Sequence, residues 1–221
     1  MSGFATARQK MVDGQVRTND VTDPRIIDAM LSIPRELFVP ESRRALAYLD
    51  LDLDVAEGGS SKRYMIKPQI IAKMLQAAQI TTSDNVLVVG CASGYAAALA
   101  ARLGTKVTGT ESELALVEKG NSVLSALGFS NVALKMAAPA DGDPAGAPYD
   151  VIILNGATEI MPDRLFEQLA EDGRLVGIFD TGKLARVMIV TRSHGDLGHR
   201  VLFDGAAPVL PGLERRPSFV F

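Results

Sequence analysis

The chain has 221 residues, a formal net charge of −3 and a pI near 5.5, so it has the size of one globular domain and no overall positive charge for binding nucleic acid. No apolar run reaches the roughly 18 residues of a membrane span, the amino-terminal region is too charged for a secretory signal, and a single cysteine excludes an internal disulfide. We therefore expect one cytoplasmic domain over residues 1–221, with no membrane or nucleic-acid partner and no metal site.

Residues 1–80 are expected to form small helices and a substrate lid. Alternating polar and apolar positions predict a helix over 4–16, and Asp23 and Pro24 provide the N-cap and first turn of a helix over 25–32. Flanking prolines favour an extended connector over 33–40, followed by a candidate short helix over 42–48 and a candidate exposed edge over 49–55. The polar stretch 57–67 is typical of a mobile lid, and Pro68 begins a helix that extends to Ala78.

Residues 81–221 are expected to form the cofactor-binding sheet. An unbroken apolar run over 86–89 predicts a strand that is covered on both faces, and small residues from Gly90 to Gly94 follow it as a turn. An alanine-rich helix is expected over 95–103, and a second strand over 106–110 ends beside Glu111.

The alternation of helix and strand continues along the chain. A helix over 112–127 ends at Gly128, and further strands are expected over 131–136, 150–154 and 174–179. A loop over 137–148 and a helix over 162–170 separate these strands, and a hairpin formed by 186–192 and 200–203 follows them. This order predicts an α/β fold with a doubly wound, mostly parallel sheet.

The turn after the first strand indicates which ligand the sheet binds. Small side chains let backbone N–H groups approach a polar ligand, and Glu111 can accept hydrogen bonds from both hydroxyls of a ribose. The run G-x-A-x-G does not match the dinucleotide fingerprint or a phosphate-binding loop. S-adenosylmethionine, with an adenosine and an amino-acid end, therefore fits best. The alternative is that the small residues only let a helix pack closely on the sheet.

Four stretches resemble the protein-L-isoaspartate O-methyltransferase family, and the resemblance covers nearly the whole chain. They are Ala29-Met30 with 33–40 (IPRELFVP), Pro68 with its helix, 86–95, and 147–152 (APYDVI). The resemblance implies a seven-stranded, Rossmann-like fold that transfers a methyl group from S-adenosylmethionine to the free carboxylate of isoaspartyl residues in damaged proteins, as a step in protein repair. A carboxylate is already ionised at neutral pH, so this chemistry depends on positioning and on exclusion of water.

Two motifs depart from the family pattern. The Thr-Ile-Ser-x-Pro motif, whose serine lies at the acceptor carboxylate, reads Tyr64-Met65-Ile66-Lys67-Pro68. Ile66 has no hydroxyl, and a lost hydrogen bond to a charged group is worth about 1.5–3 kcal/mol. The Gly-Asp-Gly motif, whose aspartate meets the adenine, reads Ala137-Ala138-Pro139, unless a shifted alignment brings Asp141 and Gly142 into that role. Other groups that could hold the acceptor carboxylate are Lys67, Tyr64, Lys62, Arg63, Ser60 and Ser61.

These assignments define the expected site and the competing functions. The candidate catalytic positions are Ile66, Lys67 and Tyr64, and the candidate cofactor-binding residues are Gly90, Cys91, Ala92, Gly94, Tyr95, Glu111, Ser112, Ala137, Ala138 and Gln69. The expected substrates are proteins or peptides that contain isoaspartyl residues. A different methyl acceptor, and a catalytically silent protein that binds only the cofactor or a partner, stay open as alternatives. The turn spacing disfavours an NAD-linked oxidoreductase.

Overall fold

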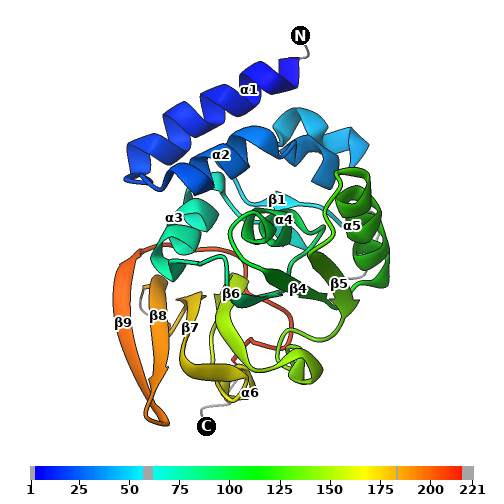
Figure 1. Cartoon of the computed structure of the whole chain (residues 1–221). Helices are drawn as coiled ribbons and strands as arrows, with labels where there is room; N and C mark the ends of the chain where they lie inside the picture. Colours follow the sequence, from blue (N-terminus) through cyan, green and yellow to red (C-terminus); the bar gives the residue numbers. More distant parts are fainter. Residues whose placement is uncertain (1–2, 57–61, 183, 216–221) are drawn as a thin grey trace, which may run out of the picture.

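The computed structural model describes residues 3–56, 62–182 and 184–215, and its centre is a seven-stranded sheet (Figure 1). The strands lie in the order β5 (Val132–Met136), β4 (Lys106–Glu111), β3 (Asn85–Val89), β6 (Tyr149–Thr158), β7 (Leu169–Phe179), β8 (Arg186–Ser193) and β9 (Asp196–Asp204). The first five are parallel, whereas β8 and β9 continue the sheet as an antiparallel hairpin. The predicted mostly parallel, seven-stranded α/β fold is therefore confirmed.

Two hydrophobic cores lie on opposite faces of the sheet. Val86 and Val88 of β3 belong to the larger core, whereas Leu87 and Val89 belong to the smaller one. Successive side chains of a strand point to opposite faces, so a strand between two cores needs apolar residues at every position. This requirement explains the unbroken apolar run that predicted β3.

Helices cover the two faces unequally. Residues of five helices enter the larger core, namely α1 (Gly3–Met11), α2 (Pro24–Ser32), α3 (Pro68–Ala78), α4 (Tyr95–Ala101) and α5 (Leu114–Ala126). The smaller core is closed by α6 (Asp163–Phe166) and by apolar residues of the segment 205–215. Figure 1 shows α6 on the side of the sheet away from the amino-terminal helices.

Two helical turns of the amino-terminal region, over 17–19 and 35–38, were not expected, whereas helices were expected over 4–16 and 42–48. α1 continues into a π-helical turn, η1 (Val12–Val16), and 3-10 turns follow as η2 (Arg17–Asn19), η3 (Arg35–Phe38) and η4 (Glu41–Leu46). The turn η3 replaces the extended connector that was expected over 33–40. Prolines at both ends exclude a long helix there, but a single 3-10 turn fits between them.

The stretch that was expected to form a lid falls partly outside the described residues, which omit 57–61. Its described part contains β2 (Tyr64–Met65), which pairs with β1 (Leu53–Asp54) in a small antiparallel sheet. Arg63, Met65 and Ile66 are buried, so this part packs on the protein instead of covering it loosely.

Several boundaries in the second half differ from the expected ones. β6 extends to Thr158, because Ala157 and Thr158 pair with Ile178 and Phe179 of β7. β7 begins at Leu169, which pairs with Tyr149, and this early start shortens the preceding helix to the four residues of α6. A 3-10 turn, η5 (Pro144–Gly146), lies in the expected loop.

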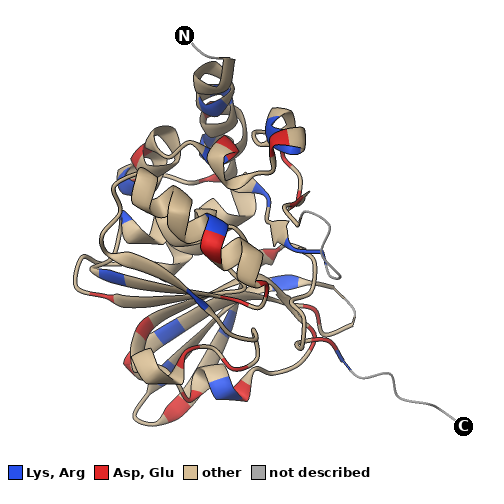
Figure 2. Cartoon of the chain, turned by 90° about the vertical axis from the view of Figure 1, so that its right-hand side faces the viewer, with Lys and Arg blue, Asp and Glu red and all other residues tan. Residues whose placement is uncertain are grey.

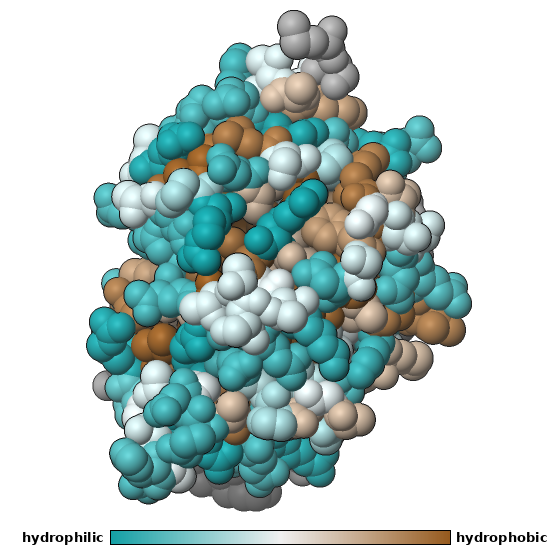
Figure 3. Space-filling model, in the orientation of Figure 1, coloured by the Kyte–Doolittle hydropathy of each residue, from teal (hydrophilic) through white to brown (hydrophobic). Residues whose placement is uncertain are grey.

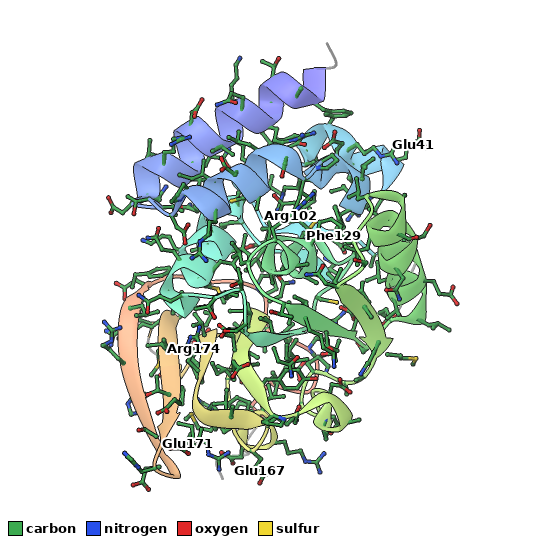
Figure 4. The ribbon with its side chains drawn as sticks, viewed as in Figure 1. Glu41, Arg102, Phe129, Glu167, Glu171 and Arg174 are labelled. Carbon is green, nitrogen blue, oxygen red and sulfur yellow. The ribbon has the colours of Figure 1, made fainter. Side chains whose placement is uncertain are left out.

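Arg174 of β7 fastens the carboxyl end of α3 to the sheet (Figure 4). Its guanidinium donates from Nε to Ala78 O at 2.6 Å and from Nη2 to Gln79 O at 2.8 Å, and it pairs with Asp84 at 2.7 Å. The last carbonyls of a helix have no partner within the helix, so Arg174 satisfies two groups that would otherwise need water.

Basic and acidic residues are interspersed along the chain (Figure 2). On the face shown in Figure 3, polar residues break the hydrophobic surface into separate patches. The edge strand β9 is largely exposed and includes Asp196, Arg200 and Asp204, and charged residues of this kind discourage pairing with the sheet of another molecule.

Candidate active site

The site lies where the strand order of the sheet reverses. β3 has β4 on one side and β6 on the other, and open α/β sheets hold ligands outside the carboxyl ends of strands at such a point. The buried amide of Asn155, in β6, donates to Gly90 O at 2.9 Å and to Tyr64 O at 3.3 Å. One side chain therefore joins β6, the turn after β3 and the β1–β2 pair.

The turn from Gly90 to Gly94 is stabilised by backbone hydrogen bonds within the turn and to β4. The N–H of Cys91 donates to Thr110 O, and the N–H of Gly94 donates to Cys91 O, both at 2.9 Å. Gly90 and Gly94 have φ values of 65° and 95°, which glycine adopts readily. Ala92 has a φ of 50°, and this left-handed conformation costs a residue with a Cβ about 1 kcal/mol or more.

Side chains of the protein itself fill the space beside both glycines. A Cβ on Gly90 would overlap Leu210, and one on Gly94 would lie 2.9 Å from Cδ1 of Leu134. Close internal packing is thus sufficient to explain why these two positions lack side chains. Their assignment to the cofactor stays a prediction.

Glu111 ends β4 with its carboxylate buried against the turn. Its Oε2 accepts a hydrogen bond from the N–H of Ala92 at 2.8 Å, and its Oε1 accepts from the N–H groups of Ser112 at 2.7 Å and Glu113 at 3.2 Å. The structure therefore brings the acidic residue and the small-residue turn together, as the expected site requires.

Arg63 covers this carboxylate. Its Nε and Nη2 donate to Oε1 of Glu111 at 2.7 and 2.6 Å, and Nη2 also lies 3.2 Å from the hydroxyl oxygen of Ser112. The side chains of Arg63 and Glu111 are 3% and 0% exposed. A ribose can pair with Glu111 only after the Arg63 side chain has moved.

The three catalytic candidates lie close together in sequence but differ in environment. Ile66 is buried in the larger core, and its carbonyl accepts a hydrogen bond from Nη2 of Arg35 at 2.9 Å. Lys67 is held by Asp52, through its N–H at 3.0 Å and its Nζ at 3.8 Å. Tyr64 contributes its carbonyl to the Asn155 contact. Ser60 and Ser61 lie outside the described residues.

The remaining cofactor candidates divide into two groups. Ala137 adjoins Glu111, because its N–H donates to Glu111 O at 2.9 Å, and Ala138 follows it on the surface. Gln69 instead donates to Asp50, which is not among the hydrogen-bond partners given for Glu111.

Asp141, the alternative adenine ligand, pairs with Arg164 of α6. The shifted alignment would therefore place the family's aspartate at an ion pair on the side of α6. Pro144, Ala147 and Gln168 line the same surface pocket of about 470 Å³.

Burial raises the pKa values of two ionisable side chains at the turn, Cys91 and Tyr95. Desolvation, supported by the negative charge of Glu111, raises the pKa of the Cys91 thiol well above its usual range. Desolvation also raises the pKa of Tyr95, although the guanidinium of Arg35, whose carbon lies 4.7 Å from the ring centroid, opposes this shift. Neither residue has the character of a nucleophile at neutral pH.

Two structural roles at the site could not be foreseen from the sequence. Leu210 packs against Gly90, and no local pattern links residues so far apart in the chain. Arg63 was one of several open choices for holding a carboxylate, but its pairing with Glu111 had no sequence signal. Buried charges are usually paired, yet this rule does not identify the partner.

The described residues contain no group of three or more His, Cys, Asp or Glu side chains that could hold a metal ion. Within the same ranges, no helix combines the length and the apolar character needed to cross a membrane.

Comparisons with known proteins identify relatives over most of the chain. The model of the family described as Protein-L-isoaspartate(D-aspartate) O-methyltransferase matches residues 6–201. A protein-L-isoaspartate O-methyltransferase of Roseiflexus sp. (strain RS-1) is 38% identical over 193 residues, which cover 87% of this chain and 86% of the relative. One from Koribacter versatilis (strain Ellin345) is 36% identical over 204 residues, covering 92% and 90%.

Solved structures show the same fold. A protein-L-isoaspartate O-methyltransferase superposes with a TM-score of 0.83 and 24% identity, over 94% of this chain and 67% of that one. A second one, from Plasmodium falciparum in complex with S-adenosyl-L-homocysteine, gives a TM-score of 0.76 and 17% identity, over 95% and 99%. The family match and the relatives above 30% identity lead to one conclusion: the chain belongs to the protein-L-isoaspartate(D-aspartate) O-methyltransferase family.

Proposed function

We propose that this protein transfers a methyl group from S-adenosyl-L-methionine to the free carboxylate of L-isoaspartyl residues in damaged proteins, as a step in protein repair. The observation that carries this proposal is the family match over residues 6–201. The buried carboxylate of Glu111, placed against the turn after β3, supports it. A single cysteine, which is buried, suits the cytoplasmic location that we also propose.

The residues at the site fit this cofactor once Arg63 has moved. Glu111 lies at the carboxyl end of β4, where a carboxylate can accept both ribose hydroxyls. Ala137 lies beside it and offers backbone groups to an adenine, and Ser112 adds a hydroxyl. We therefore propose the turn from Gly90 to Tyr95, together with Glu111, Ser112, Ala137 and Ala138, as the cofactor site. The bound cofactor supplies a methyl group activated by a sulfonium.

The protein's own contribution to the reaction is positioning. The acceptor carboxylate is ionised at neutral pH and needs no base, so the rate depends on alignment with the methyl group and on exclusion of water. Asn155 serves this alignment, because it joins the turn after β3 to the strand that leads to Ile66.

The proposal is tested by incubating the protein with labelled S-adenosyl-L-methionine and an isoaspartyl peptide. The expected result is base-labile methyl incorporation, because the product is a carboxyl methyl ester. The same peptide with a normal aspartyl residue is the matched control and should incorporate no label above background. Absence of incorporation into the isoaspartyl peptide by folded protein would reject the proposal.

A second candidate function is methyl transfer to a different acceptor. The observation that favours it is the burial of Ile66 at the position of the family's serine. Activity on a metabolite pool, without activity on isoaspartyl peptides, would support this candidate. If calorimetry shows no binding of S-adenosyl-L-methionine or S-adenosyl-L-homocysteine, both transferase functions fail and a catalytically silent protein is left.

A further inference from the structure

The basic residues of the stretch 62–67 have three different environments. Lys62 is exposed, and Lys67 is paired with Asp52. Arg63 alone among these three turns into the site, where it is 3% exposed and paired with Glu111. The contact joins residues from two separate parts of the fold, the β1–β2 pair and the end of β4.

The carboxylate of Glu111 is crowded while Arg63 is bound. Its Oε1 accepts hydrogen bonds from two guanidinium nitrogens of Arg63, from the N–H groups of Ser112 and Glu113, and from the hydroxyl of Ser112. A carboxylate oxygen has only two lone pairs. Two ribose hydroxyls can therefore bind this carboxylate only in exchange for Arg63.

The exchange requires rotation of a side chain and not movement of a strand. The carbonyl of Arg63 accepts a hydrogen bond from the N–H of Val55 at 2.7 Å, and the next residue, Tyr64, is paired with Asp54 in β1. The backbone at Arg63 is thus held on the β1–β2 pair. A long, flexible arginine side chain can leave Glu111 from this fixed point.

We infer that Arg63 alternates between two carboxylates: it rests on Glu111 until the ribose of the cofactor takes its place, and it then binds the carboxylate of the isoaspartyl acceptor. This inference rests on the proposed function. A guanidinium released from a buried pair needs a new anion, and the acceptor is the anion that the reaction supplies. If it holds one oxygen of that carboxylate, the other stays free to receive the methyl group.

This exchange has two consequences for the reaction. The cofactor binds before the acceptor, because ribose binding sets Arg63 free. Arg63 also provides the contact to the acceptor carboxylate that Ile66, which lacks a hydroxyl, cannot provide.

The test compares Arg63→Gln, Arg63→Lys and wild-type protein. In Arg63→Gln, calorimetry should show S-adenosyl-L-homocysteine binding about fivefold more tightly or better, because glutamine competes less strongly than arginine for Glu111. The KM for an isoaspartyl peptide should rise about tenfold or more, because the charged contact to the acceptor carboxylate is lost. Arg63→Lys should restore part of the acceptor KM. Arg43→Gln is the matched control, because Arg43 pairs with Asp54 of the same β1–β2 pair, and both constants should keep their wild-type values.

Opposite changes in the two constants distinguish exchange from a structural role. If Arg63→Gln weakens the binding of both ligands, or leaves both unchanged, in a wild-type background that binds the cofactor and methylates the peptide, the inference is wrong and the proposed function stands. If neither wild type nor Arg63→Gln binds S-adenosyl-L-homocysteine, the proposed function fails and the inference fails with it.

Loss of Arg63 leaves the buried charge of Glu111 without its partner, which can destabilise the fold. The double variant Arg63→Gln/Glu111→Gln removes both charges, and thermal unfolding shows whether it folds. It should bind S-adenosyl-L-homocysteine more weakly than folded Arg63→Gln, because the ribose acceptor is lost. Equal affinity in the two variants would mean that Glu111 is not the group for which Arg63 competes.

Discussion

Ala92 has a left-handed backbone conformation that glycine adopts more easily. Its φ of 50° lies between the two glycines of the turn, and its N–H must face Glu111 for the 2.8 Å hydrogen bond to form. The contact to the carboxylate thus holds an alanine in the left-handed region.

Replacing Ala92 by Gly should stabilise the protein by about 0.5–1 kcal/mol, because relief of backbone strain exceeds the entropy that glycine adds to the unfolded chain. Urea unfolding measures the change. Ala77→Gly, the same substitution inside α3, should instead destabilise by about 1 kcal/mol. A loss of stability in Ala92→Gly would show that the alanine is not strained.

At single positions, the sequence predicted which residues lie close together more reliably than it predicted where their side chains point. Glu111 could be placed beside the turn because the end of one parallel strand adjoins the end of the next. Ile66 could be aligned with the family's serine, but that alignment does not reveal that its side chain lies in the larger core. The direction depends on tertiary packing, to which Arg35 contributes through the Ile66 carbonyl.

Among the elements, α3 depends most clearly on one distant side chain. Arg174 reaches from β7 to the carbonyls of Ala78 and Gln79 and pairs with Asp84, with its side chain only 19% exposed. Arg174→Ala should therefore lower the free energy of unfolding by about 2–3 kcal/mol, because partly buried acceptors on Ala78 and Asp84 lose a charged donor.

Arg164→Ala is the control for that experiment. Arg164 also pairs with an aspartate, Asp141, but its side chain is 73% exposed, so its loss should cost less than about 1 kcal/mol. Equal losses in the two variants, measured by urea unfolding, would contradict the assigned role of Arg174.

The two ends of a helix or strand could be predicted where they are determined by nearby residues in the sequence. α3 runs from Pro68 to Ala78 as expected, because its first-turn proline and its apolar stripe are both sequence features. The far end of β6 could not be predicted, since it is set by pairing with Ile178 and Phe179 of β7. The shortness of α6 has a similar cause, because β7 begins early through the pairing of Leu169 with Tyr149.

For the molecule as a whole, buried and partly buried carboxylates determine the response to acid. Burial alone would raise the pKa of Asp84 and Asp143. Hydrogen bonds from Thr81 and Arg174 to Asp84, and from Lys135 and Tyr149 to Asp143, outweigh burial and hold both pKa values below the ordinary value of 3.8. Asp52 acts in the opposite sense, because its burial raises its pKa.

Lowered folded-state pKa values stabilise the protein above the pKa of the unfolded chain, and this stability is lost as the pH falls through the folded values. The urea midpoint should therefore decrease on acidification below about pH 4, the region set by ordinary carboxyl pKa values. The double variant Asp84→Asn/Asp143→Asn should begin less stable and show a shallower decrease. An unchanged slope would assign the acid response to other groups.

The contact between Gly90 and Leu210 has a consequence for how this protein is made. The ribosome synthesises the turn at Gly90 long before Leu210, which packs beside it, because more than half of the chain lies between these two residues. A nascent chain can align its first parallel strands early, but the space next to Gly90 closes only once Leu210 is present. The packing around the turn is therefore completed only after Leu210 has been synthesised, and chains that stop before Leu210 cannot complete it.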